Sequence, residues 1–505
     1  MRAFFRPVTL LFVALWLILY VGGRSRFFQD PGTFWHTEFG HRIANEGPFD
    51  TDPYTFTFAG QTYILYQWLG EVVIYQTYHR LGGYTGLLVG PVTLLAGLFT
   101  WLGSRLLRCG LHPVLVFVLV GITVAASSGH FHVRPHLSTM LGMAILFVLF
   151  ADVDEGRRSL RSLWWLVPLF WVWSNVHGGA LGGFATFGIA AAGWTVFWLL
   201  GWHSPIKSWA HVGQLAAIGI LSAGLFCANP YGWRLPASWI QIYQMKSLPR
   251  LIKEHTPMNL AEMNSWMVLM CAAVYVGVFA TVRPLRLRVS WLLPLVWLLL
   301  TIERVRHAPL FAIGSLALLA DLFPRTRIVA SWQARGSDLF VPPTGQSRKP
   351  WAAWVVPGIL VVTAFALSAQ RVPEQYGFAA RLDTNFWPVD LDSELANLKG
   401  TYPDGVHLFN DYALGGYVIM HAPNCRVFVD DRCELFGDEF LTEFIEGSRA
   451  DPAASIAKWQ KKYGPFDAAL VYIGDDGFEP YFAKSDEWEL VKRGQSAVLY
   501  RRKGR

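Results

Sequence analysis

The chain has 505 residues, of which 53% are hydrophobic and only 16% are Asp, Glu, Lys or Arg. Soluble domains carry about 25% charged residues, so much of this protein's surface must face something other than water, which excludes a wholly soluble protein. The net charge of +7 does not indicate nucleic-acid binding, because the basic residues fall in short loops between apolar runs.

Apolar runs along the chain are candidate transmembrane helices, since a helix that crosses a bilayer needs roughly 20 residues. A signal peptide is the alternative for the first run, but the many runs that follow favour an uncleaved first span. The predicted spans are 8–23, 84–104, 112–128, 137–151, 163–178, 180–201, 211–228, 266–282, 289–302, 308–321 and 352–369. We therefore expect an α-helical polytopic membrane protein with about 11 transmembrane helices.

Basic residues predict the orientation, because short cytoplasmic loops of membrane proteins are enriched in Lys and Arg. With the N-terminus in the cytoplasm, nearly every short basic loop lies inside, and an odd number of spans places the C-terminus outside. The cytoplasmic basic residues are then Arg105, Arg108, Arg157, Arg158, Arg161, Lys207, Arg283, Arg286, Arg288, Arg325, Arg327, Arg335, Arg348 and Lys349. We expect a multi-pass protein of a cell membrane, such as an inner membrane of the cell envelope, with a flexible cytoplasmic linker at 324–351.

Two domains follow from this topology. Residues 1–369 form the predicted transmembrane domain, with a long first external loop at 24–83, and residues 370–505 form an extracytoplasmic α/β domain. Thr62–Arg80 is apolar but carries Glu71, whose charge is costly in a bilayer, so we predict an interfacial helix there, with a span as the alternative. In the C-terminal domain the predicted strands are 406–409, 426–429 and 468–473, the helices are 439–445 and 453–462, and a hairpin joins 488–493 to 497–501.

Acidic residues of the first external loop are the first candidates for chemistry. Asp30 follows the first span directly, at the membrane surface, where a lipid-anchored substrate would place its phosphate. Asp52 and Glu71 are further carboxylates in the loop that could act in its place. Asp30 could instead cap a helix that starts near Gly32, and the two roles are compatible.

The second external loop combines imidazoles with a guanidinium. Its sequence from Gly129 to His136 contains His130, His132 and Arg134. These side chains could hold a metal, for which imidazole favours zinc-like ions over magnesium, or bind a phosphate directly. The alternative is that the histidines only bond to carbonyl groups of the loop.

Two arginines follow span nine on the predicted outer side. Arg304 and Arg306 contradict the usual placement of basic residues inside, and an anionic lipid phosphate would explain their position. A surface pair between Glu303 and Arg304, of little energetic worth, is the alternative.

The C-terminal domain carries a third group of candidates. Asn410, Asp411 and Tyr412 follow its first predicted strand, where they could bind an acceptor or serve only as polar strand-end residues. Cys425 and Cys433 could form a disulfide if the domain lies outside the cytoplasm.

These motifs and their layout resemble the GT-C glycosyltransferases, which have a long first external loop with an acidic residue just past the first span. Catalytic subunits of oligosaccharyltransferases have Asp-Pro followed by aromatic residues there, and this chain has Asp30-Pro31 and then Phe34-Trp35. The resemblance implies that Asp30 acts at the catalytic centre and binds a divalent metal such as Mg²⁺ or Mn²⁺. Arg306 resembles the late external arginine with which these enzymes bind the lipid phosphate.

The chain also departs from that family. Oligosaccharyltransferases have paired carboxylates in the loop where this chain has His130 and His132, which puts a metal site formed by Asp30 and these histidines in doubt. Asn410-Asp411-Tyr412 resembles the Asp-Tyr core of their Trp-Trp-Asp-Tyr-Gly motif, but both tryptophans are missing, so recognition of a peptide acceptor is not supported.

The resemblance implies an integral membrane glycosyltransferase that moves a sugar from a polyprenyl-phosphate donor to an extracytoplasmic glycan, lipid or protein, with inversion at the anomeric carbon. Asp30 would take the acceptor's proton, and Arg134, Arg304, Arg306 and the histidines would bind the departing phosphate. A transporter of a lipid or small solute is the alternative, although no internal repeat indicates one. A non-catalytic membrane assembly protein is the other alternative.

Overall fold

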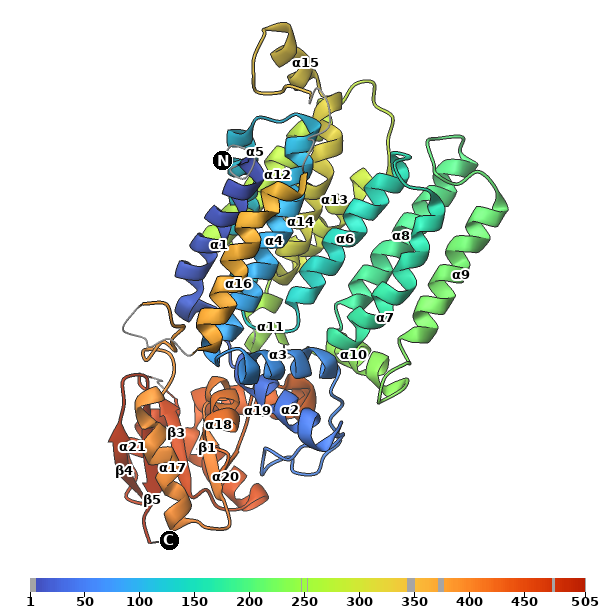
Figure 1. The fold of residues 1–505 in the computed structure, drawn as a ribbon. Coiled ribbons are helices and arrows are strands. Elements are labelled where there is room, and N and C mark those ends of the chain that lie inside the picture. The colour runs from blue at the N-terminus through green and yellow to red at the C-terminus, as the bar shows by residue number, and fades with distance from the viewer. Residues whose placement is uncertain are drawn as a thin grey trace.

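The computed structural model describes residues 6–246, 248–251, 253–342, 350–370, 377–474 and 477–504. Figure 1 shows a bundle of long helices with a small α/β domain at one end, beside α2 (Gly32–Glu46) and α3 (Trp68–Arg80). The first helix begins at the opposite end of the bundle. The chain therefore crosses the bundle between its start and its C-terminal domain, as the odd number of predicted spans requires.

Every predicted span is a helix in the structure, and the prediction of a helical polytopic membrane protein is confirmed. Eight helices among the described residues are long and apolar enough to cross a membrane, and two shorter apolar helices, α9 and α13, accompany them. The helices at the eleven predicted spans are these ten and α7, which has only 11 residues. They are α1 (Pro7–Arg26), α4 (Tyr84–Cys109), α5 (Pro113–Ser127), α6 (Leu137–Asp154), α7 (Leu166–Val176), α8 (Ala180–Leu199), α9 (Trp209–Leu225), α12 (Met263–Ala280), α13 (Val289–Glu303), α14 (Ala308–Leu322) and α16 (Val355–Ala369).

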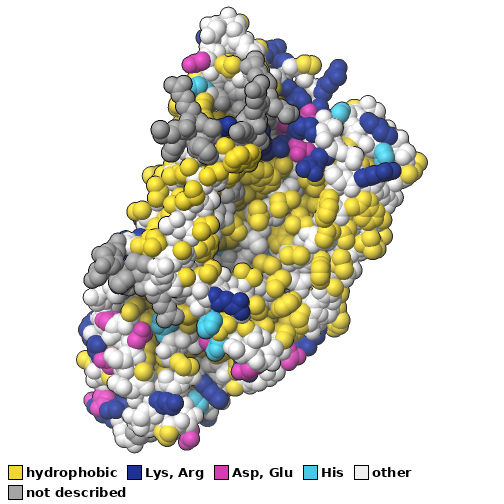
Figure 2. All heavy atoms as spheres, viewed as in Figure 1, with side chains coloured by type: hydrophobic (Ala, Val, Ile, Leu, Met, Phe, Trp, Pro, Cys, Tyr) yellow, Lys and Arg dark blue, Asp and Glu magenta, His cyan; other side chains and the backbone are white. Residues whose placement is uncertain are grey.

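The surface has the distribution expected of a body that crosses a membrane. Figure 2 shows hydrophobic side chains over the middle of the visible face and charged side chains at both ends. In the basic loops far from the α/β domain, acidic side chains neutralise part of the charge. The pairs are Arg105–Asp152 at 2.9 Å, Arg157–Asp321 at 2.8 Å and Arg288–Glu155 at 2.7 Å.

Two loop segments contain helices of their own. The apolar segment Thr62–Arg80 becomes α3, whose 13 residues are too few for a span, which agrees with an interfacial helix. The segment 324–351, predicted to be a flexible linker, contains the helix α15 (Arg327–Ala334), at whose start Thr326 accepts the N–H of Val329. Arg348 and Lys349 lie outside the described residues.

The C-terminal domain is built on a five-stranded sheet in the order β2-β1-β3-β5-β4. The first three strands run parallel, and β5 pairs antiparallel with β3 and β4. The predicted strands and helices are present, α17, α18 and α21 are additional, and Cys425 and Cys433 are both free thiols. The elements are β1 (Val406–Asn410), β2 (Cys425–Val427), β3 (Ala468–Tyr472), β4 (Trp488–Arg493), β5 (Ala497–Arg502), α17 (Asp392–Thr401), α18 (Gly415–His421), α19 (Cys433–Ala450), α20 (Pro452–Tyr463) and α21 (Phe478–Lys484).

The first external loop is attached to this sheet. Thr55 forms a parallel bridge with Val427 of β2, and the hydroxyl of Thr57 donates to the carbonyl of Phe428 at 2.8 Å. Phe34 of α2 lies edge-on to Trp387 and Tyr417 of the C-terminal domain. These contacts hold the start of α2, where Asp30 lies, against the C-terminal domain.

Candidate functional site

Asp30 occupies the turn between α1 and α2 and bonds in two directions. Its Oδ1 accepts the N–H of Gly32 at 2.8 Å, which is the capping interaction expected at the start of α2. Its Oδ2 lies 3.2 Å from Nη1 of Arg134 in the second external loop. Burial alone would lower the pKa of Arg134, but nearby carboxylates, Asp30 foremost, raise it above its usual value. Asp30 thus both begins α2 and holds a guanidinium.

A second carboxylate reaches this place from the C-terminal domain. Asp431 follows β2, and its Oδ1 accepts the Nε1–H of Trp35 at 2.7 Å. Burial first, and the charge of Asp30 second, raise the pKa of Asp431 to about 8. Sequence reasoning did not select Asp431. The signal for it was a run of three charged residues directly after an apolar strand, at the edge where parallel sheets carry their functional groups.

Two glycines give the start of α2 its close packing. A Cβ on Gly32 would lie 2.7 Å from Oδ1 of Asp30 and 3.0 Å from Nε of Arg134, so a larger residue would have to displace this ion pair. A Cβ on Gly416 in α18 would lie 2.3 Å from the carbonyl oxygen of Pro31. The C-terminal domain therefore approaches Asp30 at backbone distance.

We expect Gly416→Ala to lower the free energy of unfolding by about 1–3 kcal/mol, because the added methyl group overpacks a contact with backbone that cannot swing aside. Thermal unfolding of the purified protein in detergent measures this. Gly400→Ala in α17 is the matched control, since its Cβ would meet nothing within 4 Å. An equal effect of the two substitutions would contradict the tight contact.

Arg432 follows Asp431 and lies at the centre of a buried ionic triad. Its side chain is fully buried and reaches Oδ1 of Asp52 at 2.7 Å and Oδ2 of Asp430 at 2.5 Å. The Oδ2 of Asp52 accepts from the backbone N–H and the hydroxyl of Thr55, at 2.9 and 2.6 Å. Both oxygens of Asp52 are thus occupied within the protein, and this candidate carboxylate joins the first loop to the C-terminal domain.

Glu71, the third candidate carboxylate, is also enclosed. It lies in α3 with 1% of its surface exposed, and its Oε1 is 3.0 Å from Nδ1 of His36. Burial raises the pKa of Glu71 well above its usual value and lowers the pKa of His36. The pair of Glu71 and His36 connects α3 to α2.

The loop 129–136 places His130 beside a glutamate, Glu254, that the sequence did not single out. Nε2 of His130 lies 3.5 Å from Oε2 of Glu254, in a short turn of the loop 229–265. His136 bonds through Nε2 to the carbonyl of His130 at 2.7 Å, as the alternative for these histidines proposed. The carbonyl of His132 accepts the N–H of Arg134. Nδ1 of His132 is buried without a hydrogen bond among the described residues.

Arg304 and Arg306 differ in their surroundings. Arg306 contacts the ring of His255, which directly follows Glu254. Arg304 lies with its guanidinium carbon 5.3 Å from the ring centre of Tyr243, and no pair with Glu303 is found among the described residues. Burial would raise the pKa of Glu254, but Arg306, His130 and Arg134 together hold it well below its usual value. Arg306 and Arg134 therefore approach one carboxylate from two different loops.

The three acceptor candidates are bonded within the C-terminal domain. Asn410 is fully buried, donates to the carbonyl of Val429 at 2.7 Å and accepts from the N–H of Phe428 at 2.9 Å. Oδ2 of Asp411 accepts the N–H of Tyr472 at 2.6 Å, and the Tyr412 hydroxyl lies 2.9 Å from the sulfur of Cys433. Asn410 thereby joins β1 to the end of β2, immediately before Asp430 and Asp431.

A metal site formed by Asp30, His130 and His132 does not fit the donors present. Among the described residues no three His, Cys, Asp or Glu side chains come together as a metal-binding group. Asp30 already bonds to Arg134 and Gly32, and Nε2 of His130 faces Glu254 at 3.5 Å, without a hydrogen bond among the described residues. The cation beside Asp30 is the guanidinium of Arg134.

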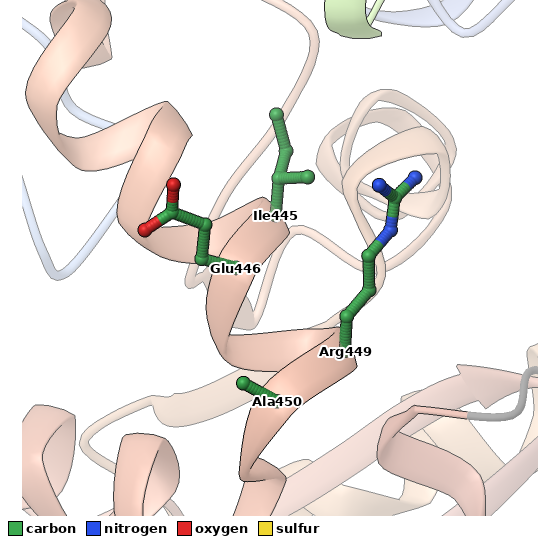
Figure 3. Close-up of a pocket in the computed structure, with 4 residues that line it drawn as sticks. All are labelled: Ile445, Glu446, Arg449 and Ala450. Atoms are coloured by element: carbon green, nitrogen blue, oxygen red, sulfur yellow. The ribbon is translucent and has the colours of Figure 1, made fainter.

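A surface depression lies elsewhere on the C-terminal domain. Ile445, Glu446, Arg449 and Ala450 of α19 line it. Figure 3 shows Arg449 and Glu446 pointing away from each other on this helix. None of the candidate residues described above lines this depression, so it is not part of the site.

No protein-family model and no curated protein matches the sequence. Solved structures do match. The apo oligosaccharyltransferase of Archaeoglobus fulgidus is 10% identical with a TM-score of 0.52, covering 92% of this chain and 69% of that chain. The same protein tethered to an acceptor peptide with the NVT sequon is 11% identical with a TM-score of 0.52, covering 97% and 73%. ArnT from Cupriavidus metallidurans, bound to undecaprenyl phosphate, is 14% identical with a TM-score of 0.47, covering 97% of each chain.

At this level of identity the likeness concerns the fold. It extends over both the helical bundle and the C-terminal domain of this chain, since 92% or more of the residues are covered. The resemblance drawn from Asp30-Pro31 and the long first loop is therefore confirmed as a resemblance of fold. The chain has the fold of the archaeal oligosaccharyltransferase, in agreement with the resemblance to GT-C glycosyltransferases that its sequence indicated.

Proposed function

We propose that the chain is a membrane glycosyltransferase that transfers a sugar from a polyprenyl-phosphate donor to a glycan, lipid or protein outside the cytoplasm. The lipid holds such a donor in the bilayer, so its anomeric carbon meets an acceptor only at the membrane surface. In the orientation that we propose, the N-terminus is cytoplasmic and the domain formed by residues 370–505 covers the outer end of the bundle. The positive charge of the loops at the other end supports this orientation.

One observation carries the proposal, which is the meeting of acids and cations from distant parts of the chain at the end of the bundle. Asp30 and Asp431 lie beside Arg134. Arg134 and Arg306 both stabilise the ionised form of Glu254. Substitution at an anomeric carbon needs a proton acceptor for the attacking hydroxyl and positive charge for the departing phosphate. The group of residues supplies both kinds of side chain.

The roles divide between the two sides of the group. Arg306 and Arg134, with His130 and His132, would receive the phosphate, because guanidinium groups bind phosphate through paired hydrogen bonds. The carboxylates would face the sugar and the acceptor. In-line attack with a single displacement would invert the anomeric centre. The C-terminal domain and the loop 229–265 would form the acceptor groove.

Replacing Arg306 tests the proposal. Arg306→Ala should lower the transfer rate at least about 100-fold, because it removes a cation that stabilises charge developing on the leaving phosphate. The rate is measured in proteoliposomes as loss of radiolabelled sugar from undecaprenyl-phosphate hexose and pentose donors, with soluble glycans and peptides as acceptors. The matched control is Arg286→Ala, an exposed arginine in a loop at the other end of the bundle. Transfer at the wild-type rate by a folded Arg306→Ala variant would contradict the proposal.

A further inference from the structure

We infer that Asp431, supplied by the C-terminal domain, is the group that takes the proton from the acceptor hydroxyl, whereas Asp30 acts by holding Arg134. This inference rests on the proposed function and changes the role that the resemblance implies for Asp30. It makes the C-terminal domain part of the chemistry, in addition to its part in shaping an acceptor groove.

Asp30 is poorly placed to take up a proton, because both of its oxygens are engaged. Oδ1 accepts the N–H of Gly32, and Oδ2 faces Arg134 at 3.2 Å. The exposed fractions of the two side chains are 14% for Asp30 and 24% for Arg134, so the pair is largely removed from water. An acceptor hydroxyl would therefore have to compete with Arg134 or Gly32 for an oxygen of Asp30.

Asp431 has a carboxylate oxygen without a hydrogen-bond partner among the described residues, whereas both oxygens of Asp30 have one. Its Oδ1 is oriented by Trp35, and among the described residues no hydrogen-bond donor reaches its Oδ2. Asp431 as a whole residue is only partly buried, which leaves it less enclosed than Asp430 and Arg432 on either side of it. Its pKa of about 8, raised by burial and by Asp30, suits a general base, which works best when its pKa lies near the working pH.

The groups that change the pKa of Asp431 come from the start of α2, from the loop that carries Arg134 and from the C-terminal domain itself. Asp30 and Asp430 raise its pKa, and Arg134 and the Trp35 hydrogen bond lower it. The charge of Asp431 also acts on Tyr412. Burial, together with this charge, raises the pKa of the Tyr412 phenol well above its usual value, so the phenol stays neutral. Asp431 therefore changes its protonation near neutral pH.

The proposed step is balanced without a further reactant. The acceptor's O–H proton passes to Oδ2 of Asp431 while the acceptor oxygen forms its bond to the anomeric carbon. The bond between the anomeric carbon and the phosphate oxygen breaks, and its electron pair leaves with the polyprenyl phosphate beside Arg134 and Arg306. Asp431 then releases the proton to water and returns to its starting state.

Asp431→Asn is the decisive variant. It should lower the transfer rate by about 100- to 10,000-fold, the range that a general base contributes. Binding of undecaprenyl phosphate, measured by native mass spectrometry, should change less than about twofold. Asp431→Glu should recover part of the rate, because it restores a carboxylate. A residue that only supports the fold would not separate transfer from binding in this way.

The pH dependence gives a second readout. A base must be deprotonated, so wild-type transfer should rise with pH through a midpoint near 8 and fall at lower pH. Trp35→Phe removes the hydrogen bond that lowers the Asp431 pKa and should move the midpoint to higher pH. Asp30→Asn removes the neighbouring charge that raises the pKa and should move the midpoint of its residual activity to lower pH.

The outcomes distinguish the inference from the proposed function. If the wild type and Asp431→Asn transfer sugar at rates within about threefold of each other, the inference is overturned and the proposed function stands. If the wild type transfers no sugar from any of the donors, the proposed function fails and takes the inference with it. Loss of transfer with retained binding and a shifted midpoint in Trp35→Phe supports both.

Discussion

Asp30→Ala is expected to lower the rate of sugar transfer by about 100- to 1,000-fold, the effect of removing one charged group that acts on the transition state. The substitution removes the carboxylate that holds Arg134 at 3.2 Å and that accepts the N–H of Gly32 at 2.8 Å. Asp30→Asn keeps an acceptor for Gly32 but loses the charge, so comparing initial rates of the two variants separates capping from the ion pair. If charge matters most, the asparagine variant is nearly as slow.

The first loop supplies a matched control for this experiment. Asp50 pairs with Arg234 at 3.0 Å, and about half of its side chain is exposed, 51%. Asp50→Ala should keep the wild-type rate within about twofold, because exposed ion pairs contribute little. Full activity in an Asp30→Ala protein that is inserted and folded would place the reaction elsewhere in the molecule.

Arg432→Met is expected to lower the free energy of unfolding of the C-terminal domain by about 3–5 kcal/mol. The substitution leaves Asp52 and Asp430 without their counter-charge, and both side chains are completely buried, with 0% exposed. Chemical unfolding in detergent, followed by near-ultraviolet circular dichroism, measures the loss. The first loop should also become sensitive to protease, because Asp52 anchors it to this domain.

Two further variants show whether the loss comes from unpaired charge. Arg426→Met removes an exposed arginine from β2 and should change stability by less than about 0.5 kcal/mol. Combining Arg432→Met with Asp52→Asn and Asp430→Asn should recover part of the stability, since neutral groups are cheaper to bury than unpaired charges. A triple variant that is less stable than Arg432→Met alone would argue against this explanation.

Much of the fold could be predicted because it depends on local pattern. The long apolar runs that form helices such as α6 and α14 need no tertiary information, since length and hydropathy suffice. The strand at 468–472 is likewise an apolar run with clear ends. α18 was missed because it begins with Gly415-Gly416, which ordinarily indicates a turn. In the folded protein these glycines are needed for backbone contacts with Val429 and Pro31.

The site was less predictable because its residues meet only through tertiary structure. Sequence reasoning selected Asp30, Arg134 and Arg306 but could not show that Asp30 and Arg134 form a pair. Nothing local distinguishes Asp52, whose charge is neutralised inside the protein, from Asp30, whose carboxylate lies at the bundle end. Asp431 and Glu254 became candidates only when the structure placed them beside these arginines.

The link between Asp52 and Arg432 spans 380 residues of sequence. At a synthesis rate of 5–20 residues per second, the ribosome makes Arg432 roughly 20–80 s after Asp52. During that interval the first loop exists without β2, the strand with which Thr55 pairs in the folded protein. The buried carboxylate of Asp52 therefore lacks its counter-charge, and the first loop cannot reach its final packing, until Arg432 has been made.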